Sequence, residues 1–279
     1  MSTAQTAKTH HVTAPSGTKY AYRRLGVTSP GIPLLILTHF RGVMDKFDPL
    51  LLNLLAAHRS VITVDYSGVG LSTGRLATSI RDSAADILEF LAAIGEREID
   101  LLGFSLGGMV AQLVALNADP AVTKIRKLIL AGTTSSAGEG VVASENEDVG
   151  AVGSVKDVDI GVFRKLFFPR NREGEIACQA WWERIHERKG DGVVATWLSQ
   201  GYVDGAEGLK SQGEMIAKWA APDASRELDG SYARLGSLGI PVLVANGHVS
   251  FLFLNFFFFC LLFCLPLFVC ELRRYDDDD

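Results

Sequence analysis

Short apolar runs alternate with longer stretches of helical pattern over most of this chain. Residues 79–94 place apolar side chains on one face of a helix, whereas residues 106–116 are apolar on nearly all sides. We therefore predict an amphipathic helix and a buried helix at these positions. The short runs have no polar face and predict buried strands at 32–38, 61–65, 99–104, 125–131 and 240–247. Strands and helices in this alternation indicate an α/β fold with a doubly wound, mostly parallel sheet.

The junction between the third of these strands and the buried helix reads Gly103-Phe104-Ser105-Leu106-Gly107. A serine at such a junction makes a tight turn with strained backbone angles. Glycine on either side removes the side chains that would collide with neighbouring elements. The hydroxyl group then stands at the positive end of a helix, and the N–H of Leu106 points to where an oxyanion would form. We predict that Ser105 is a catalytic nucleophile; the alternative is a glycine-rich turn with an idle serine.

With its neighbouring segments, this motif resembles the α/β-hydrolase superfamily, which includes serine hydrolases with a cap domain. The first predicted strand ends in His39-Phe40-Arg41-Gly42, where the family has a His-Gly motif in a loop that donates a second oxyanion N–H. The resemblance implies that Phe40 or Arg41 supplies this N–H, with no preference between them, and that His39 orders the loop. The loop after the second strand resembles the family's D-x-x-G-x-G-x-S pattern. For its first residue, Asp65, we prefer ordering of this loop over a role as catalytic acid.

The resemblance also implies how the chain is divided. Residues 1–134 would form the first part of the hydrolase core, and residues 135–235 a helical cap. In the family's numbering of strands, this cap follows the sixth strand, at 125–131, and residues 236–247 contain the seventh. Residues 248–279 would be an aberrant hydrophobic tail.

Two stretches of the expected cap, 161–169 and 177–188, have helical character. The second stretch carries Trp181 and Trp182. These side chains either line a substrate pocket or pack the cap onto the core.

A serine nucleophile needs a histidine to accept its proton and an acid to orient that histidine, and in this fold both follow the serine. The acid usually follows the seventh strand, but here His248 stands at this place, and no aspartate occurs between Asp229 and Asp276. No histidine follows His248, and Glu139 is an off-pattern candidate for the acid. The other histidines lie at positions that do not suit a base: His10, His11, His58 and His186. We therefore expect an incomplete triad and impaired catalysis.

Residues 251–270 are apolar and carry no charge. Such a segment is long enough to span a bilayer, so a membrane anchor is one interpretation. The others are translated non-coding sequence and a buried final core segment. We prefer non-coding sequence, because the tail begins where the catalytic acid should be and shows neither strand alternation nor a polar helix face. This choice predicts a chain truncated or mis-spliced after the seventh strand, without an eighth strand and closing helix, and with poor solubility.

The resemblance implies hydrolysis of a small ester or related acyl substrate through an acyl-Ser105 intermediate. The alternatives are an inactive relative, either a binding protein or a remnant, and a cofactor-independent haloperoxidase-like activity.

Composition narrows the remaining possibilities. A net charge of −5 and a pI near 5.7 give no nucleic-acid footprint, and no pattern indicates a cofactor or metal. Cys178 is the only cysteine before the tail, and the N-terminus has no apolar leader. We therefore expect a cytoplasmic protein without a disulfide framework, unless residues 251–270 anchor it in a membrane. The oligomeric state stays open.

Overall fold

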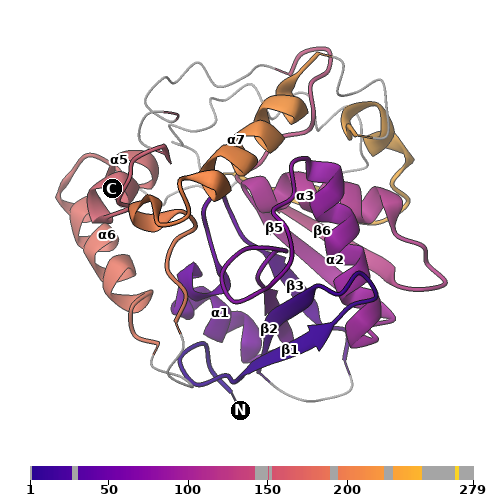
Figure 1. The fold of residues 1–279 in the computed structure, drawn as a ribbon, viewed down its shortest axis with the longest axis horizontal. Coiled ribbons are helices and arrows are strands. Elements are labelled where there is room, and N and C mark those ends of the chain that lie inside the picture. Colours follow the sequence, from indigo (N-terminus) through magenta and orange to yellow (C-terminus); the bar gives the residue numbers. More distant parts are fainter. Residues whose placement is uncertain are drawn as a thin grey trace, which may run out of the picture.

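A β-sheet forms the centre of the molecule (Figure 1). Its eight strands follow the order β1-β2-β4-β3-β5-β6-β7-β8. The computed structural model describes residues 2–26, 31–141, 150, 153–188, 194–222 and 229–246, and the backbone of 268–269. The strands are β1 (Thr9–Thr13), β2 (Lys19–Leu25), β3 (Leu34–Leu37), β4 (Val61–Val64), β5 (Glu98–Phe104), β6 (Lys124–Ala131), β7 (Val242–Ala245) and β8 (Phe268–Val269). Strands β1 and β2 are antiparallel to their neighbours, and β3 to β8 are parallel. The expected α/β fold with a mostly parallel sheet is confirmed.

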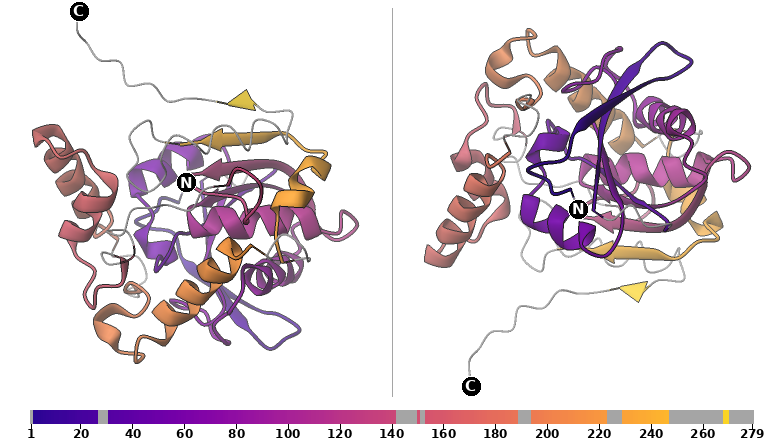
Figure 2. Two further views of the ribbon diagram at one scale, coloured as in Figure 1. Left: turned by 90° about the horizontal axis from the view of Figure 1, so that it is seen from above. Right: turned by 90° about the horizontal axis from the view of Figure 1, so that it is seen from below.

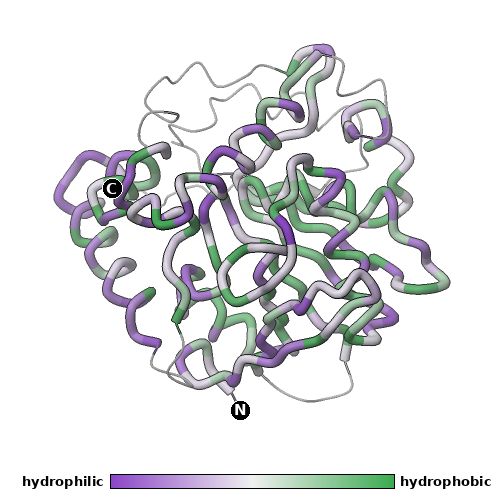
Figure 3. Tube along the Cα trace, in the orientation of Figure 1, coloured by the Kyte–Doolittle hydropathy of each residue, from purple (hydrophilic) through white to green (hydrophobic). Residues whose placement is uncertain are grey.

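Helices cover both faces of this sheet. They are α1 (Pro49–Ala56), α2 (Ile80–Ile94) and α3 (Leu106–Asn117). Leu35 and Leu37 of β3 belong to a hydrophobic core shared with α2 and α3, whereas Leu34 and Ile36 belong to a second core shared with α1. Because successive side chains of a strand point to opposite faces, α1 lies on one face and α2 and α3 lie on the other (Figure 2). The hydrophobic positions follow the central strands and α3 (Figure 3).

The N-terminal hairpin and α1 are elements that the sequence analysis did not identify. His10 and His11 of β1 are exposed, so this strand lacks the apolar run by which the central strands were recognised. Helix α1 does carry a start signal: the Asp48 side chain accepts a hydrogen bond from the N–H of Leu50 at 2.9 Å, and Pro49 occupies the first turn.

Between β6 and β7 the chain forms α5 (Ile160–Phe167), α6 (Arg172–Arg184) and α7 (Glu207–Ala220), which we call the inserted helices (Figure 1). Helices α5 and α6 correspond to the two helical stretches expected in a cap. They share a small hydrophobic core of their own, and Phe163 lies at its centre with ring centroids 4.5 Å from Trp181 and 4.9 Å from Trp197.

The edge of the sheet beyond β7 differs from the expectation. Leu243 and Val244 of β7 pair in parallel with Phe268 and Val269 of β8, so β7 is not the edge strand and an eighth strand is present. The short strand was missed because residues 251–270 show no alternation of polar and apolar positions. The expectation that a closing helix is missing concerns the rest of the tail, which lies outside the described residues. Within the described part of the chain, no helix is long and apolar enough to cross a bilayer.

Candidate active site

Ser105 forms the tight turn that joins β5 to α3. Its backbone angles are φ 54° and ψ −121°, which no ordinary strand or helix residue adopts. A Cβ atom at Gly103 would overlap the carbonyl of Gly107, and one at Gly107 would overlap the carbonyl of Leu37. The two glycines of the motif are therefore required by contact with backbone atoms, as the sequence predicted.

Four hydrogen bonds hold this strained residue. The Ser105 N–H donates to the Ala131 carbonyl at 2.9 Å, which ties the turn to β6. The Ser105 carbonyl accepts from the Thr133 hydroxyl at 2.7 Å and from the N–H groups of Gly108 at 2.8 Å and Met109 at 3.3 Å. Because its backbone is satisfied on both sides, Ser105 keeps its strained conformation and its side chain is left half-buried at the surface of a cavity.

Two backbone N–H groups near Ser105 are candidates for an oxyanion hole. Leu106 is the first residue of α3, where an N–H has no acceptor within its own helix. Phe40 follows β3, and the described residues offer no acceptor for its N–H. The N–H of Arg41, the third candidate, donates to the Gln212 side chain at 2.6 Å. Arg41 is thereby already bound to α7.

Arg41 also connects the loop after β3 to the inserted segment through its side chain. The guanidinium group is buried and donates to the carbonyls of Leu198 at 2.9 Å, Val155 at 2.6 Å, Ser199 at 3.1 Å and Gly153 at 3.2 Å. Its own carbonyl accepts from the Leu198 N–H at 2.9 Å. The residue adopts φ 58°, a left-handed conformation that these contacts hold in place.

His39 orders its own loop, in agreement with the expectation. Its Nδ1 lies 2.9 Å from the Phe40 carbonyl, and the rings of Phe104 and Trp197 lie 5.6 Å and 5.7 Å from its ring. Since a carbonyl only accepts, Nδ1 carries the proton. Burial lowers the pKa of His39 below its usual 6.5, so the ring is neutral near pH 7.

Asp65 lies outside the cavity and holds two loops together. Its carboxylate accepts from the N–H of Met44 at 2.7 Å and from the N–H of Leu71 at 2.9 Å, which supports the interpretation that it orders the loop after β4. Burial raises the pKa of Asp65 to about 7.

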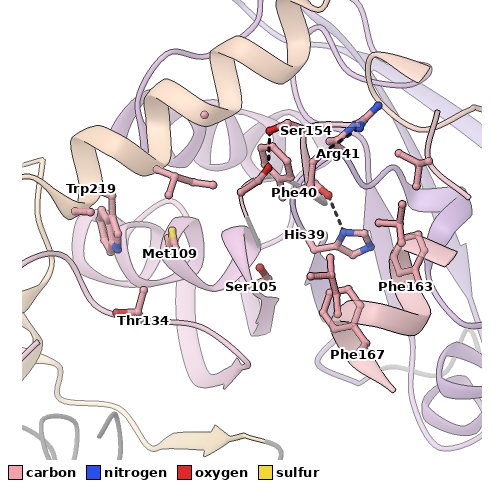
Figure 4. Close-up of a pocket in the computed structure, with 18 of the residues that line it drawn as sticks. His39, Phe40, Arg41, Ser105, Met109, Thr134, Ser154, Phe163, Phe167 and Trp219 are labelled. Atoms are coloured by element: carbon pink, nitrogen blue, oxygen red, sulfur yellow. Dashed lines mark hydrogen bonds between the residues drawn. The ribbon is translucent and has the colours of Figure 1, made fainter. Parts of the chain in front are cut away.

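A cavity of about 540 Å³ opens above Ser105, between the carboxyl ends of the strands and the inserted helices (Figure 4). The core supplies Ser105, Met109 and Thr134, among others, and the inserted segment supplies mainly apolar side chains: Val162, Phe163, Phe167, Trp197, Ile216 and Trp219. Trp181 and Trp182 do not line it and pack within the inserted helices instead. The tryptophans that do line it, Trp197 and Trp219, were missed because no motif marks them.

The described residues do not bring a histidine and a carboxylate together at Ser105. His10, His11, His58 and His186 are exposed and do not line the cavity, and neither does Glu139. No described residue is hydrogen-bonded to the Ser105 hydroxyl. His248 lies outside the described residues.

Similarity to known proteins agrees with this geometry. A family model described as alpha/beta hydrolase fold matches residues 32–154. A solved alpha/beta hydrolase fold protein from Chitinophaga pinensis superposes with a TM-score of 0.78 at 29% sequence identity, covering 96% of this chain and 90% of that one. The chain is an α/β-hydrolase fold protein. The same coverage does not support the expectation of a truncated chain.

Two further proteins that this chain resembles are esterases. A pimeloyl-[acyl-carrier protein] methyl ester esterase from Pectobacterium carotovorum is 38% identical over 91 residues, which is 33% of this chain and only 34% of that enzyme. The crystal structure of an esterase from Rhodococcus sp. has a TM-score of 0.65 at 23% identity and covers 94% of this chain and 89% of its own. At that identity the Rhodococcus structure shows a shared fold alone.

Proposed function

We propose that this protein hydrolyses a small ester through Ser105, with the N–H groups of Leu106 and Phe40 as the oxyanion hole. The observation that carries the proposal is the strained Ser105 turn, which presents a hydroxyl group to an apolar cavity at the N-terminus of α3. Phe40 is preferred to Arg41 because the Arg41 N–H is already bound to Gln212. The name of the 38% identical relative, a methyl ester esterase, supports the choice of an ester.

The reaction assigns each group a role. The Ser105 oxygen attacks the ester carbonyl carbon, and the negative charge that develops on the carbonyl oxygen is stabilised by the two N–H groups. The Ser105 proton passes to a base and then to the departing alcohol, which leaves an acyl-serine. Water attacks this intermediate, releases the carboxylic acid and restores the serine hydroxyl.

We propose further that the base is inefficient, so that turnover is slow. His39 shares the cavity with Ser105, but its Nδ1 proton is held by the Phe40 carbonyl and no described carboxylate orients its ring. Loss of the histidine of a serine triad lowers kcat by about a millionfold, with roughly 10³–10⁴-fold catalysis over water remaining. The lack of a histidine–carboxylate pair at Ser105 among the described residues favours a second candidate function, a non-catalytic protein that binds its ligand in the same cavity.

A fluorophosphonate probe tests the proposal. We expect slow labelling of a single serine, identified by peptide mass spectrometry as Ser105, and no labelling of the Ser105→Ala variant. Ser135→Ala is the matched control, since Ser135 also lines the cavity, and it should label as the parent does. Complete absence of labelling at Ser105 would favour the binding protein. Ester turnover in the ordinary enzyme range, about 1–10³ per second, would show that an efficient base is present.

A further inference from the structure

The carbonyl group of Ser105 accepts a hydrogen bond from a buried side chain. The Thr133 hydroxyl donates to it at 2.7 Å, and only 1% of Thr133 is exposed. The other two donors to this carbonyl, the N–H groups of Gly108 and Met109, belong to the first turn of α3, as is usual for the residue that caps a helix. Among the described residues, Thr133 is thus the one donor to this carbonyl that lies outside α3.

The position of Thr133 relative to α3 is fixed by its neighbours. The Gln112 side chain donates to the carbonyl of Thr134 at 2.9 Å and to the carbonyl of Gly108 at 3.1 Å, which ties the chain after β6 to the helix. A Cβ atom at Gly108 would lie 2.4 Å from the Thr133 Cγ2, so the methyl group of the threonine packs directly against the first turn of α3. Because a threonine side chain branches at Cβ and is stiff, its hydroxyl group stays where it meets the Ser105 carbonyl.

This hydrogen bond also fixes the direction of the Leu106 N–H. The Ser105 carbonyl and the Leu106 N–H belong to one trans peptide unit, which is planar, so the two groups point in opposite directions. A donor that holds the carbonyl on one side therefore aims the N–H on the other, where the described residues offer it no acceptor. Hydrogen bonds in a chain polarise one another, so the Thr133 hydroxyl also makes this N–H a stronger donor.

We propose that Thr133 is a positioning residue of the oxyanion hole, which aims the Leu106 N–H at the oxygen of the reacting carbonyl and strengthens it as a donor. Thr133 does not line the cavity, so it acts through the Ser105–Leu106 peptide unit and not by touching the substrate. The inference rests on the proposed function, which assigns the Leu106 N–H to the oxyanion. Its effect belongs to the transition state, in which charge develops on that oxygen, and not to the binding of the ground state.

Two threonines at opposite ends of β6 make a matched pair for the test. Thr123 precedes the strand and is 2% exposed, and its hydroxyl donates to the Glu96 carbonyl at 2.7 Å. Thr133→Val and Thr123→Val therefore remove the same kind of buried hydrogen bond, and only the first lies beside Ser105. The readout is the kinetics of fluorophosphonate labelling, because the phosphoryl oxygen of the probe takes the place of the ester carbonyl oxygen. The dependence on probe concentration separates the rate constant of phosphonylation from the dissociation constant of the probe.

We expect Thr133→Val to slow the phosphonylation of Ser105 about tenfold and to leave the dissociation constant of the probe unchanged. This is less than the loss of about 10²–10³-fold that follows removal of an oxyanion donor, because the N–H is misdirected and not removed. Thr123→Val should be labelled at the rate of the parent, and so should Thr133→Ser, which keeps the hydroxyl group. If Thr133→Val does not fold, Thr133→Ala removes the same hydroxyl without placing a methyl group against the Ser105 carbonyl.

The amide nitrogen NMR signal of Leu106 reads the peptide unit directly, since it depends on the hydrogen bonds of the preceding carbonyl. It should shift in Thr133→Val and stay in place in Thr123→Val.

Several outcomes would overturn the role of Thr133. They are equal slowing by Thr133→Val and Thr123→Val, a change in the dissociation constant of the probe alone, a Thr133→Ser variant as slow as Thr133→Val, and an unchanged Leu106 signal. Absence of labelling at Ser105 in the parent would instead reject the proposed hydrolysis. The Leu106 signal then decides this inference alone: a shift in Thr133→Val supports it, and no shift rejects it.

Discussion

The two walls of the cavity are built by different means. On the core side, backbone atoms crowd one another: Gly103 and Gly107 touch carbonyls, and the Ser105 N–H is bonded to β6. On the inserted side, the wall consists of side chains from α5, from α7 and from the segment before α7, such as Phe163, Trp219 and Trp197. The position of the nucleophile is therefore determined by local backbone packing, whereas the shape of the ligand site is determined by long-range side-chain contacts.

The largest expected effect comes from adding one methyl group to the core wall. Gly103→Ala places its Cβ against the Gly107 carbonyl, a backbone atom that cannot move unless β5 and α3 separate. We expect a loss of about 3 kcal/mol or more in the free energy of unfolding, measured by urea denaturation.

Replacement of a glycine by alanine in the inserted wall should instead raise the free energy of unfolding. Gly213 lies within α7 and also lines the cavity, but a Cβ there would meet nothing within 4 Å. Gly213→Ala should stabilise the protein by about 0.5–1 kcal/mol, because alanine favours a helix interior. Equal destabilisation by both variants would remove the distinction between the walls.

The same contrast explains what could be predicted from sequence. The Ser105 turn depends on residues that are adjacent in the chain. Its glycines and the apolar strand and helix beside it could therefore be predicted from the sequence. The N–H of Arg41 could not be assigned, because its acceptor, Gln212, lies 171 residues further along the chain. The adjacent Trp181 and Trp182 were candidates for lining the pocket, but the cavity is lined by Trp197 and Trp219, because tertiary packing determines which side chains face it.

Arg41 joins the two walls, and its replacement should have an intermediate effect. Lysine in Arg41→Lys carries one compact charge and cannot reach four carbonyls in different directions. We expect the free energy of unfolding to decrease by about 2 kcal/mol. Amide hydrogen exchange should become faster at Leu198, whose N–H donates to the Arg41 carbonyl.

Arg184→Lys is the matched control for Arg41. Arg184 also links an inserted helix to the core, through Asp48, but both side chains are partly exposed, at 29% and 20%. Such a pair contributes only about 0–1 kcal/mol. If Arg41→Lys and Arg184→Lys lower the free energy of unfolding equally, or if hydrogen exchange at Leu198 does not change, then Arg41 is not the residue that couples the walls.

The smallest expected effect is a change in the pH dependence of stability at His39, which contacts both walls through Phe104 and Trp197. Burial holds the pKa of His39 below 6.5, so under mildly acidic conditions the unfolded chain binds this proton more readily than the folded one. His39 therefore contributes stability above pH 6.5 that is lost as the pH falls. Asp65, whose pKa is raised from 3.8 to about 7, acts in the opposite direction, because its contribution decreases as the pH rises through this range.

The two contributions can be separated with His39→Gln. Glutamine can still donate to the Phe40 carbonyl but does not titrate, so unfolding midpoints in urea should lose the decrease below pH 6.5 and keep the Asp65 dependence. His58→Gln, at an exposed site, controls for the substitution itself. If both variants lose the decrease of the unfolding midpoint below pH 6.5 to the same extent, the effect does not arise from burial of His39 between the two walls.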